Sequence, residues 1–157
     1  MRTFITTILF VFLLLGCKSG NNLSKEETIS LMNEKVASSR YTFVAQTAIP
    51  LSGRSINLDN SYSLKVSKDT IESYLPYFGR AYTAPISPSA DGGIKFVSTD
   101  FKYNVSDKKK GMWDISIETK DVPVRYKLFL KIGDSGYGTL IVQETNRQSI
   151  SFYGKIE

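Results

Sequence analysis

The sequence predicts a mostly β protein, a single antiparallel β-meander curled into a barrel-like sheet or a two-sheet sandwich, with one N-terminal α-helix. Apolar and polar residues alternate with period two from Tyr41 to the end of the chain. Turn signals recur at short intervals, and no helical segments lie between the strands to cover a parallel sheet. The 157 residues, 41% of them hydrophobic, are enough for one domain with a core.

The N-terminal segment has the features of an export signal. Arg2 precedes a nearly unbroken apolar run, Phe4–Leu15, which is shorter than the roughly 20 residues of a membrane-spanning helix. The run ends in Leu14-Leu15-Gly16-Cys17, which resembles the bacterial lipobox and implies cleavage before Cys17 and lipid attachment to it. The alternative is a plain signal peptide, but Cys17 is the sole cysteine and stands where a lipobox needs one.

We therefore expect a lipoprotein signal peptide at 1–16, a lipidated cysteine with a polar tether at 17–23, and a single β-rich domain at 24–157. The position after Cys17 holds Lys18, not the aspartate associated with inner-membrane retention of lipoproteins in some bacteria. No acidic cluster of the kind found in surface-exported lipoproteins follows. These resemblances favour the outer membrane, with the domain on its periplasmic face.

The first folded element is expected to be a helix from Lys25 to Ala37. Ser24 and Glu27 have the spacing of a capping box, and Ile29, Met32 and Val36 recur at helical spacing. Strands follow. Apolar and polar residues alternate in Tyr41–Ile49, and Ile56–Val66 is the clearest half-buried strand. Thr70–Leu75 is expected to be the strand that runs back after a turn.

The second half is expected to contain a loop at Ala84–Gly93 and then further strands. The strand that starts at Ile94 changes phase near Ser98–Asp100, which indicates a bend. The remaining predicted strands share the same alternation: they begin near Trp113 and Val124, include Leu140 and Val142, and end the chain at Ile150–Ile156. The total is about eight or nine strands.

The stretch Tyr74–Tyr82 stands out because aromatic residues, Pro76, Gly79 and Arg80 are crowded together. It is too broken for a regular element and too apolar for a solvated loop. One interpretation is a ligand site, for which the candidates are Tyr77, Phe78, Arg80 and Tyr82. The other, which burial energetics favours, is a structural plug whose rings seal one end of the sheet.

Three segments resemble the domain-of-unknown-function family 4251, small exported proteins and lipoproteins of Bacteroidales-type bacteria. They are Tyr74–Tyr82, Gly92–Phe96 and Asn146–Ile156, and the resemblance covers roughly Glu34 to the end of the chain. It implies one β-rich domain in an exported lipoprotein, and it assigns no activity and no site.

Other candidate sites are weaker. Thr70, in Asp69-Thr70-Ile71, resembles a short O-glycosylation acceptor pattern of such bacteria. Arg147 is either a ligand-binding residue or part of a hairpin turn, and the turn is favoured. The absence of histidine removes the commonest general base and metal ligand, so no metal and no cofactor is expected. The basic residues are scattered apart from Lys108–Lys110, which argues against nucleic acid.

We expect a non-enzymatic, membrane-anchored binding or interaction module. Its ligand would be a small amphipathic molecule, a glycan or another envelope protein. One alternative is a carboxylate-dependent hydrolase of glycan or peptidoglycan, with two carboxyl groups about 5–9.5 Å apart. Its candidates by residue type are Asp59, Glu72, Asp91, Asp100, Asp114, Glu118 and Asp121. Another alternative is a structural subunit of an envelope complex, recognisable by an exposed apolar patch.

Overall fold

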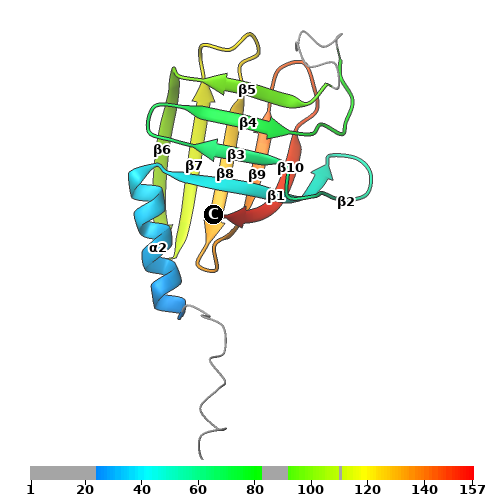
Figure 1. The fold of residues 1–157 in the computed structure, drawn as a ribbon. Coiled ribbons are helices and arrows are strands. Elements are labelled where there is room, and N and C mark those ends of the chain that lie inside the picture. The colour runs from blue at the N-terminus through cyan, green and yellow to red at the C-terminus, as the bar shows by residue number, and fades with distance from the viewer. Residues whose placement is uncertain (1–23, 83–91, 110) are drawn as a thin grey trace, which may run out of the picture.

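The computed structural model describes residues 24–82, 92–109 and 111–157, which form one helix and ten strands (Figure 1). The helix is α2 (Lys25–Ser38). The strands are β1 (Tyr41–Pro50), β2 (Ile56–Asn57), β3 (Ser63–Val66), β4 (Ile71–Leu75), β5 (Ile94–Ser98), β6 (Phe101–Lys109), β7 (Met112–Thr119), β8 (Lys127–Gly133), β9 (Tyr137–Gln143) and β10 (Ile150–Ile156). The predicted signal peptide, Cys17, most of the Ala84–Gly93 loop and Lys110 lie outside these ranges, and so does the side chain of Lys108.

All the strand pairs are antiparallel, and the sheet order is β5-β4-β3-β1-β10-β9-β8-β7-β6, with β2 beside β1. The mostly β, barrel-like fold with an N-terminal helix is therefore confirmed. A simple meander would leave β1 and the last strand at opposite edges. Here β1 pairs with β10 in the middle of the order, and the two edges are β5 and β6. Figure 1 shows the β3–β5 strands crossing in front of β6–β9, so the sheet folds over on itself.

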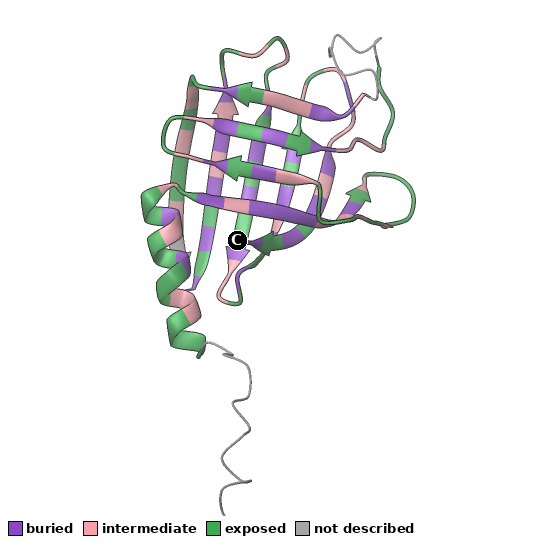
Figure 2. Cartoon of the chain, in the orientation of Figure 1, coloured by how far each residue is buried: buried purple, intermediate pink, exposed green. Residues whose placement is uncertain are grey.

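The core lies between these two halves of the sheet. Alternate residues of β4 and of β7–β10 point into it, as the banded colouring of Figure 2 shows. One row runs across four strands through fully paired, buried positions: Ile115, Leu130, Leu140 and Phe152. Each such apolar side chain contributes roughly 1.5–3 kcal/mol when it is removed from water. The opposite face of the same strands therefore faces outward.

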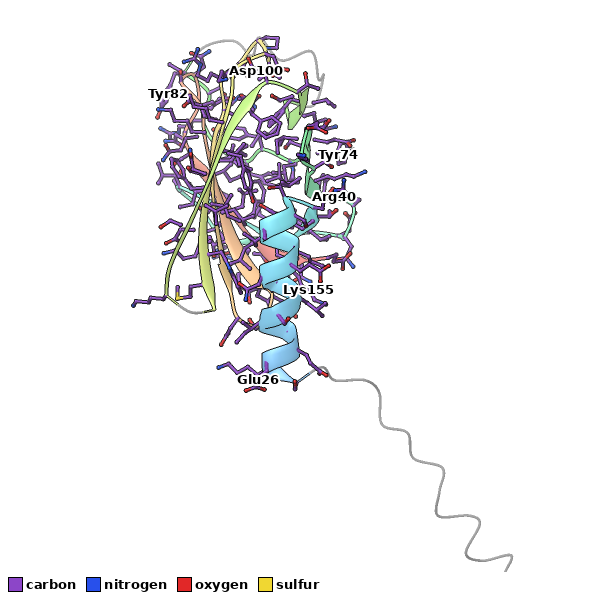
Figure 3. The ribbon with its side chains drawn as sticks, turned by 90° about the vertical axis from the view of Figure 1, so that its left-hand side faces the viewer. Glu26, Arg40, Tyr74, Tyr82, Asp100 and Lys155 are labelled. Atoms are coloured by element: carbon purple, nitrogen blue, oxygen red, sulfur yellow. The ribbon has the colours of Figure 1, made fainter. Side chains whose placement is uncertain are left out.

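Helix α2 begins as predicted, with both hydrogen bonds of the capping box between Ser24 and Glu27. Its buried residues are Met32 and Val36, which join the core. Figure 3 shows the helix along one side of the molecule, with Glu26 at the end opposite Tyr82. The described residues contain no helix long and apolar enough to cross a membrane.

Two predicted strands differ in the structure. The predicted strand Ile56–Val66 is wrong as a single element, because Asp59 accepts a hydrogen bond from the amide of Ser61 and turns the chain between β2 and β3. In β1 a bulge between Ala45 and Thr47 reverses the phase. As a result Ala48 is buried, and Ile49, which was predicted on the same face as Tyr41, is exposed.

The bend predicted near Ser98–Asp100 is a corner that separates β5 from β6. Asp121 holds it, because its carboxylate accepts hydrogen bonds from the Ser98 hydroxyl, from the amide and hydroxyl of Thr99, and from the amide of Asp100. The same corner therefore joins the two edge strands of the sheet.

Candidate functional site

The stretch Tyr74–Tyr82, which we call the aromatic stretch, begins in the last two residues of β4 and closes one end of the sheet. The hydroxyl of Tyr77 lies 3.0 Å from the carbonyl oxygens of Arg80 and of Gln148, which share its single proton. The guanidinium carbon of Arg147 lies 4.8 Å from the centre of the Tyr77 ring. Tyr77 is thus held between its own loop and the segment before β10.

Arg147 is the polar centre of this end. Its side chain is only 4% exposed, its Nε lies 2.6 Å from Oε1 of Glu144, and its Nη1 donates to the carbonyl oxygen of Gly92. Burial raises the pKa of Glu144, and the Arg147 guanidinium acts in the opposite direction. Oε2 of Glu144 is buried without a hydrogen-bond partner among the described residues. Arg147 therefore links three segments that are distant in sequence.

The other predicted ligand-binding residues lie apart from this centre. Phe78 is half-buried against the core, and Arg80 and Tyr82 are exposed. The backbone of this segment pairs with the residues around Arg147: the amide of Tyr82 donates to the Asn146 carbonyl oxygen, at 2.8 Å. The structure brings Tyr77 together with Arg147 and leaves Arg80 and Tyr82 at the surface.

Thr70, the candidate glycosylation site, is half-buried in the turn between β3 and β4, where its carbonyl oxygen accepts from the amide of Ser67 at 2.9 Å. Cys17, the predicted lipid attachment site, lies outside the described residues.

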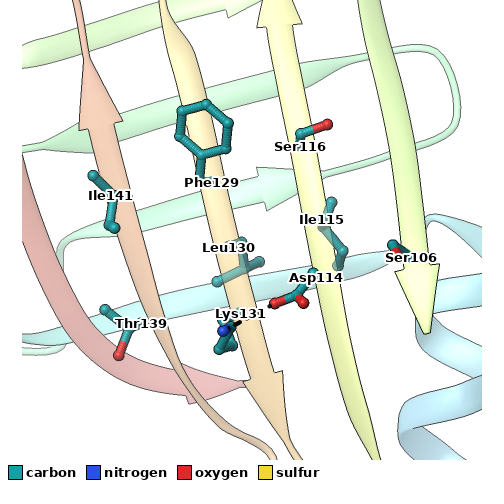
Figure 4. A pocket seen from close by; sticks show the side chains of 9 residues that line it. All are labelled: Ser106, Asp114, Ile115, Ser116, Phe129, Leu130, Lys131, Thr139 and Ile141. Atoms are coloured by element: carbon teal, nitrogen blue, oxygen red, sulfur yellow. Dashed lines mark ion pairs between the residues drawn. The ribbon is translucent and has the colours of Figure 1, made fainter. Parts of the chain in front are cut away.

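A depression of about 680 Å³ lies elsewhere, on the outer face of β6–β9 (Figure 4). Two adjacent rows of side chains form it. In the first row Phe129 is paired with Ser116 on one side and with Ile141 on the other. In the second row Lys131 is paired with Asp114 and Thr139 in the same way. The remaining lining residues are Ser106, Ile115 and Leu130. We call this depression the outer groove.

The outer groove combines an apolar row with a charged one. Phe129 is 41% exposed and Ile141 37% exposed, although both stand on regular strands. Nζ of Lys131 lies 3.4 Å from Oδ1 of Asp114, so the positive and negative charges face each other. This arrangement offers apolar surface beside hydrogen-bond donors and acceptors, which is the usual composition of a ligand-binding site.

Aromatic surface continues from the outer groove onto β10. Tyr153 is paired with Thr139, and its ring stacks on that of Tyr137 with 5.7 Å between the ring centres. Both tyrosines are exposed. We call Phe129, Ile141, Tyr137 and Tyr153 together the outer platform.

Three depressions among the described residues are each lined by a single carboxylate. Asp114 is the sole carboxylate lining the outer groove, Asp121 lines a depression of about 220 Å³ beside Phe96 and Tyr126, and Glu118 lines one of about 210 Å³. Within the same described ranges, no cluster of three metal-ligating side chains is found. The polar side chains that line the outer groove are the Asp114 carboxylate, the Lys131 amine and the hydroxyls of Ser106, Ser116 and Thr139.

The outer groove was not predicted from the sequence, although one signal of it is present there. Phe129 is the apolar residue on the otherwise basic face of an alternating strand, between Lys127 and Lys131. Glu144, the partner of Arg147, was also absent from the candidate carboxylates.

Comparison with known proteins gives a family and a fold. The family model named "Domain of unknown function (DUF4251)" matches residues 24–156. A crystal structure of a DUF4251 family protein from Bacteroides eggerthii DSM 20697 is similar in fold, with a TM-score of 0.61 and 11% sequence identity over 82% of this chain and 86% of that one. Among functionally curated proteins, no match is found. The chain thus belongs to the DUF4251 family, as the three sequence segments indicated.

Proposed function

We propose that this protein is a lipid-anchored, non-enzymatic binding module of the cell envelope, and that it binds through the outer groove. The lipobox-like Leu14–Cys17 supports the anchor. Lys18, together with the lack of an acidic cluster after it, supports the periplasmic face of the outer membrane. The observation that carries the binding role is the exposure of Phe129 and Ile141 side by side in a depression of about 680 Å³. Ligand pockets of proteins commonly have volumes of about 300–1,000 Å³.

The outer groove is a better candidate than the aromatic stretch, for a physical reason. Tyr77 is already engaged, by two carbonyl oxygens and by Arg147, so binding a ligand there would require these contacts to break. Phe129 and Ile141 are held by regular strands, and a ligand that covers them removes apolar surface from water without rearrangement.

The outer groove also supports binding more than hydrolysis. A glycoside hydrolase needs two carboxyl groups on either side of the scissile bond. Asp114 is the one carboxylate in the lining, and it faces Lys131. Of the other candidates, Asp121 is engaged by the corner between β5 and β6, and Asp100 lies 2.6 Å from Lys120 Nζ.

Site-specific photocrosslinking in the native cell tests this proposal. A photoreactive amino acid replaces Ile141 in the outer groove, and the matched control carries it at the exposed Lys65 of β3. We expect a defined crosslinked species from position 141 and none from position 65. The same species from both positions, or none from either, would reject the outer groove as the binding site.

A further inference from the structure

We infer that the outer groove and the outer platform bind a neutral oligosaccharide. This inference rests on the proposed binding function and names the class of ligand. The outer groove has a row of apolar side chains beside a row of polar ones, and a sugar ring likewise has an apolar face and a polar rim. The C–H face of a pyranose is apolar, whereas the hydroxyl groups at its rim both donate and accept hydrogen bonds.

The apolar row supplies the surface on which a ring can lie. Phe129 and Ile141 are directly paired across β8 and β9, so their side chains form one continuous exposed strip. An aromatic ring is rigid and loses little conformational entropy when a flat partner stacks on it. Long flexible side chains in the same place would lose more.

The polar row supplies partners for hydroxyl groups. Asp114, Lys131 and Thr139 lie two positions further along the same strands, about 7 Å from the apolar row. That spacing is comparable to the width of one pyranose ring, so a ring over Phe129 and Ile141 places its rim above this row. Asp114 accepts, Lys131 donates, and the hydroxyl of Thr139 does both.

The charges favour a neutral ligand. Within the lining, Lys131 is the cation and Asp114 the anion, and Nζ and Oδ1 lie 3.4 Å apart. An acidic sugar would meet the Asp114 carboxylate beside the lysine, and a basic sugar would meet Lys131 beside the carboxylate. A hydroxyl group can join the pair by donating to Asp114 and accepting from Lys131, without displacing either residue.

The length of the surface favours a chain over a single sugar. The polar row continues from Thr139 to Tyr153 on β10, and Tyr137 stacks on Tyr153. Exposed side chains therefore extend from β7 to β10, which is three strand spacings of about 4.8 Å, or roughly 14 Å. That distance exceeds one pyranose ring, so more than one ring can contact the face at once.

A calorimetric titration with defined sugars tests the inference. The probes are neutral hexasaccharides of glucose, mannose, xylose and N-acetylglucosamine, and the acidic probe is a hexamer of galacturonic acid. The protein is the full chain purified from membranes in a detergent without a sugar headgroup. We expect at least one neutral hexasaccharide to bind, and the acidic hexamer to bind at least about tenfold more weakly than that sugar.

Variants locate the binding. Phe129→Ser combined with Ile141→Ser is expected to weaken binding at least about tenfold, and Lys131→Met to weaken it by a similar factor. Tyr74→Ser, at an exposed tyrosine of β4, is the matched control and should leave affinity unchanged. Phe129→Tyr keeps the flat ring and should bind within about threefold of the wild type. Circular dichroism and urea unfolding of the serine double variant, compared with the wild type, show whether its loss of binding comes from misfolding.

Three results would overturn the inference. One is that no neutral hexasaccharide binds. Another is that binding survives the Phe129 and Ile141 double substitution, which would place it elsewhere. The third is that the acidic hexamer binds best. The photocrosslinker at position 141 could capture a protein while none of the sugars binds. In that case the proposed ligand class is wrong, and the outer groove remains the binding site. If both the sugar titration and the photocrosslinking fail, the oligosaccharide inference and the proposed binding function are both rejected.

Discussion

Nε of Arg147 lies 2.6 Å from Oε1 of Glu144, and both side chains are about 95% removed from solvent. This pair holds together the end of the sheet where the aromatic stretch, Gly92 and the start of β10 meet. A buried ion pair contributes little net stability compared with apolar residues of the same shape, but the loss of one partner leaves an uncompensated charge. The pair should therefore be sensitive to single substitutions.

Arg147→Met is expected to lower the free energy of unfolding by about 3–5 kcal/mol, because Glu144 then stays buried without its partner. The matched control is Lys120→Met, which removes the cation of the exposed pair with Asp100 and should cost about 0–1 kcal/mol. Urea denaturation measures both. Equal losses in the two variants would show that burial of the Glu144–Arg147 pair has no energetic consequence.

The double variant Glu144→Leu/Arg147→Met separates charge burial from packing. We expect it to lose less stability than the sum of the single losses, because neither charge is left alone. A double-mutant cycle by urea denaturation gives the coupling energy. An additive result would mean that each residue acts through its other contacts, such as that of Arg147 with Gly92.

Gly154→Ala is expected to be destabilising by about 1–3 kcal/mol or more, because a methyl group at this position would lie 2.1 Å from the carbonyl oxygen of Val44. Gly154 faces Ala45 at the β1 bulge, where β1 and β10 approach closely. Gly133→Ala is the matched control, since its nearest neighbour would be 3.6 Å away, and a change below about 1 kcal/mol is expected. Thermal unfolding of the two variants measures the difference, and similar melting temperatures would contradict the close approach.

Asp121→Asn should destabilise the protein most near neutral pH and progressively less as the pH falls below the unfolded pKa. Hydrogen bonds from Ser98 and from the amide of Thr99 hold the pKa of Asp121 well below its usual value of 3.8. The folded state therefore binds the proton less readily than the unfolded state. The contribution is complete above the unfolded pKa and disappears as the pH falls through the folded pKa.

Urea unfolding at roughly pH 7 and about pH 3 measures this dependence. Because a pH of about 3 lies between the unfolded and the folded pKa, only part of the difference between wild type and variant should be lost there. Glu72→Gln, an exposed carboxyl on the outer face of β4, serves as the control. A difference between wild type and Asp121→Asn that grows on acidification would contradict the role of Asp121 at the corner.

Cys17→Ser should release the protein from the membrane fraction and abolish incorporation of a labelled fatty acid. Each buried methylene group of an acyl chain contributes about 0.8 kcal/mol to membrane binding, so several acyl chains make the attachment stable. Ser19→Ala, in the predicted tether, is the neighbouring control and should remain anchored. An unlabelled wild type, or a serine variant that still sediments with membranes, would contradict the predicted lipid attachment.

Local patterns in the sequence predicted the elements well. Strands with one buried face show a period of two in the sequence, as in Leu128, Leu130 and Ile132, and the capping box at Ser24 marked the start of α2. What the pattern could not show was the β1–β10 pairing, because contacts between the ends of a chain leave no local trace. The bulge in β1 follows from that pairing, and so do the exposure of Ile49 and the burial of Ala48.

The sites were harder to predict than the fold. Arginine is rarely buried, so a polar run around Arg147 indicated a surface turn. Its burial depends on Tyr77, which is distant in sequence, and on Glu144. Phe129 was visible as an apolar residue on a basic face, but its proximity to Ile141 depends on the register of β8 and β9, which the sequence alone does not specify.

The most direct test of binding in the outer groove is a crystal structure of the full chain, purified from its own membranes without removing bound molecules. We expect electron density over Phe129 and Ile141, with polar contacts to Asp114, Lys131 or Thr139. An empty outer groove, together with a molecule bound against Tyr77 and Arg80, would contradict binding in the outer groove. It would place the binding site at the aromatic stretch instead.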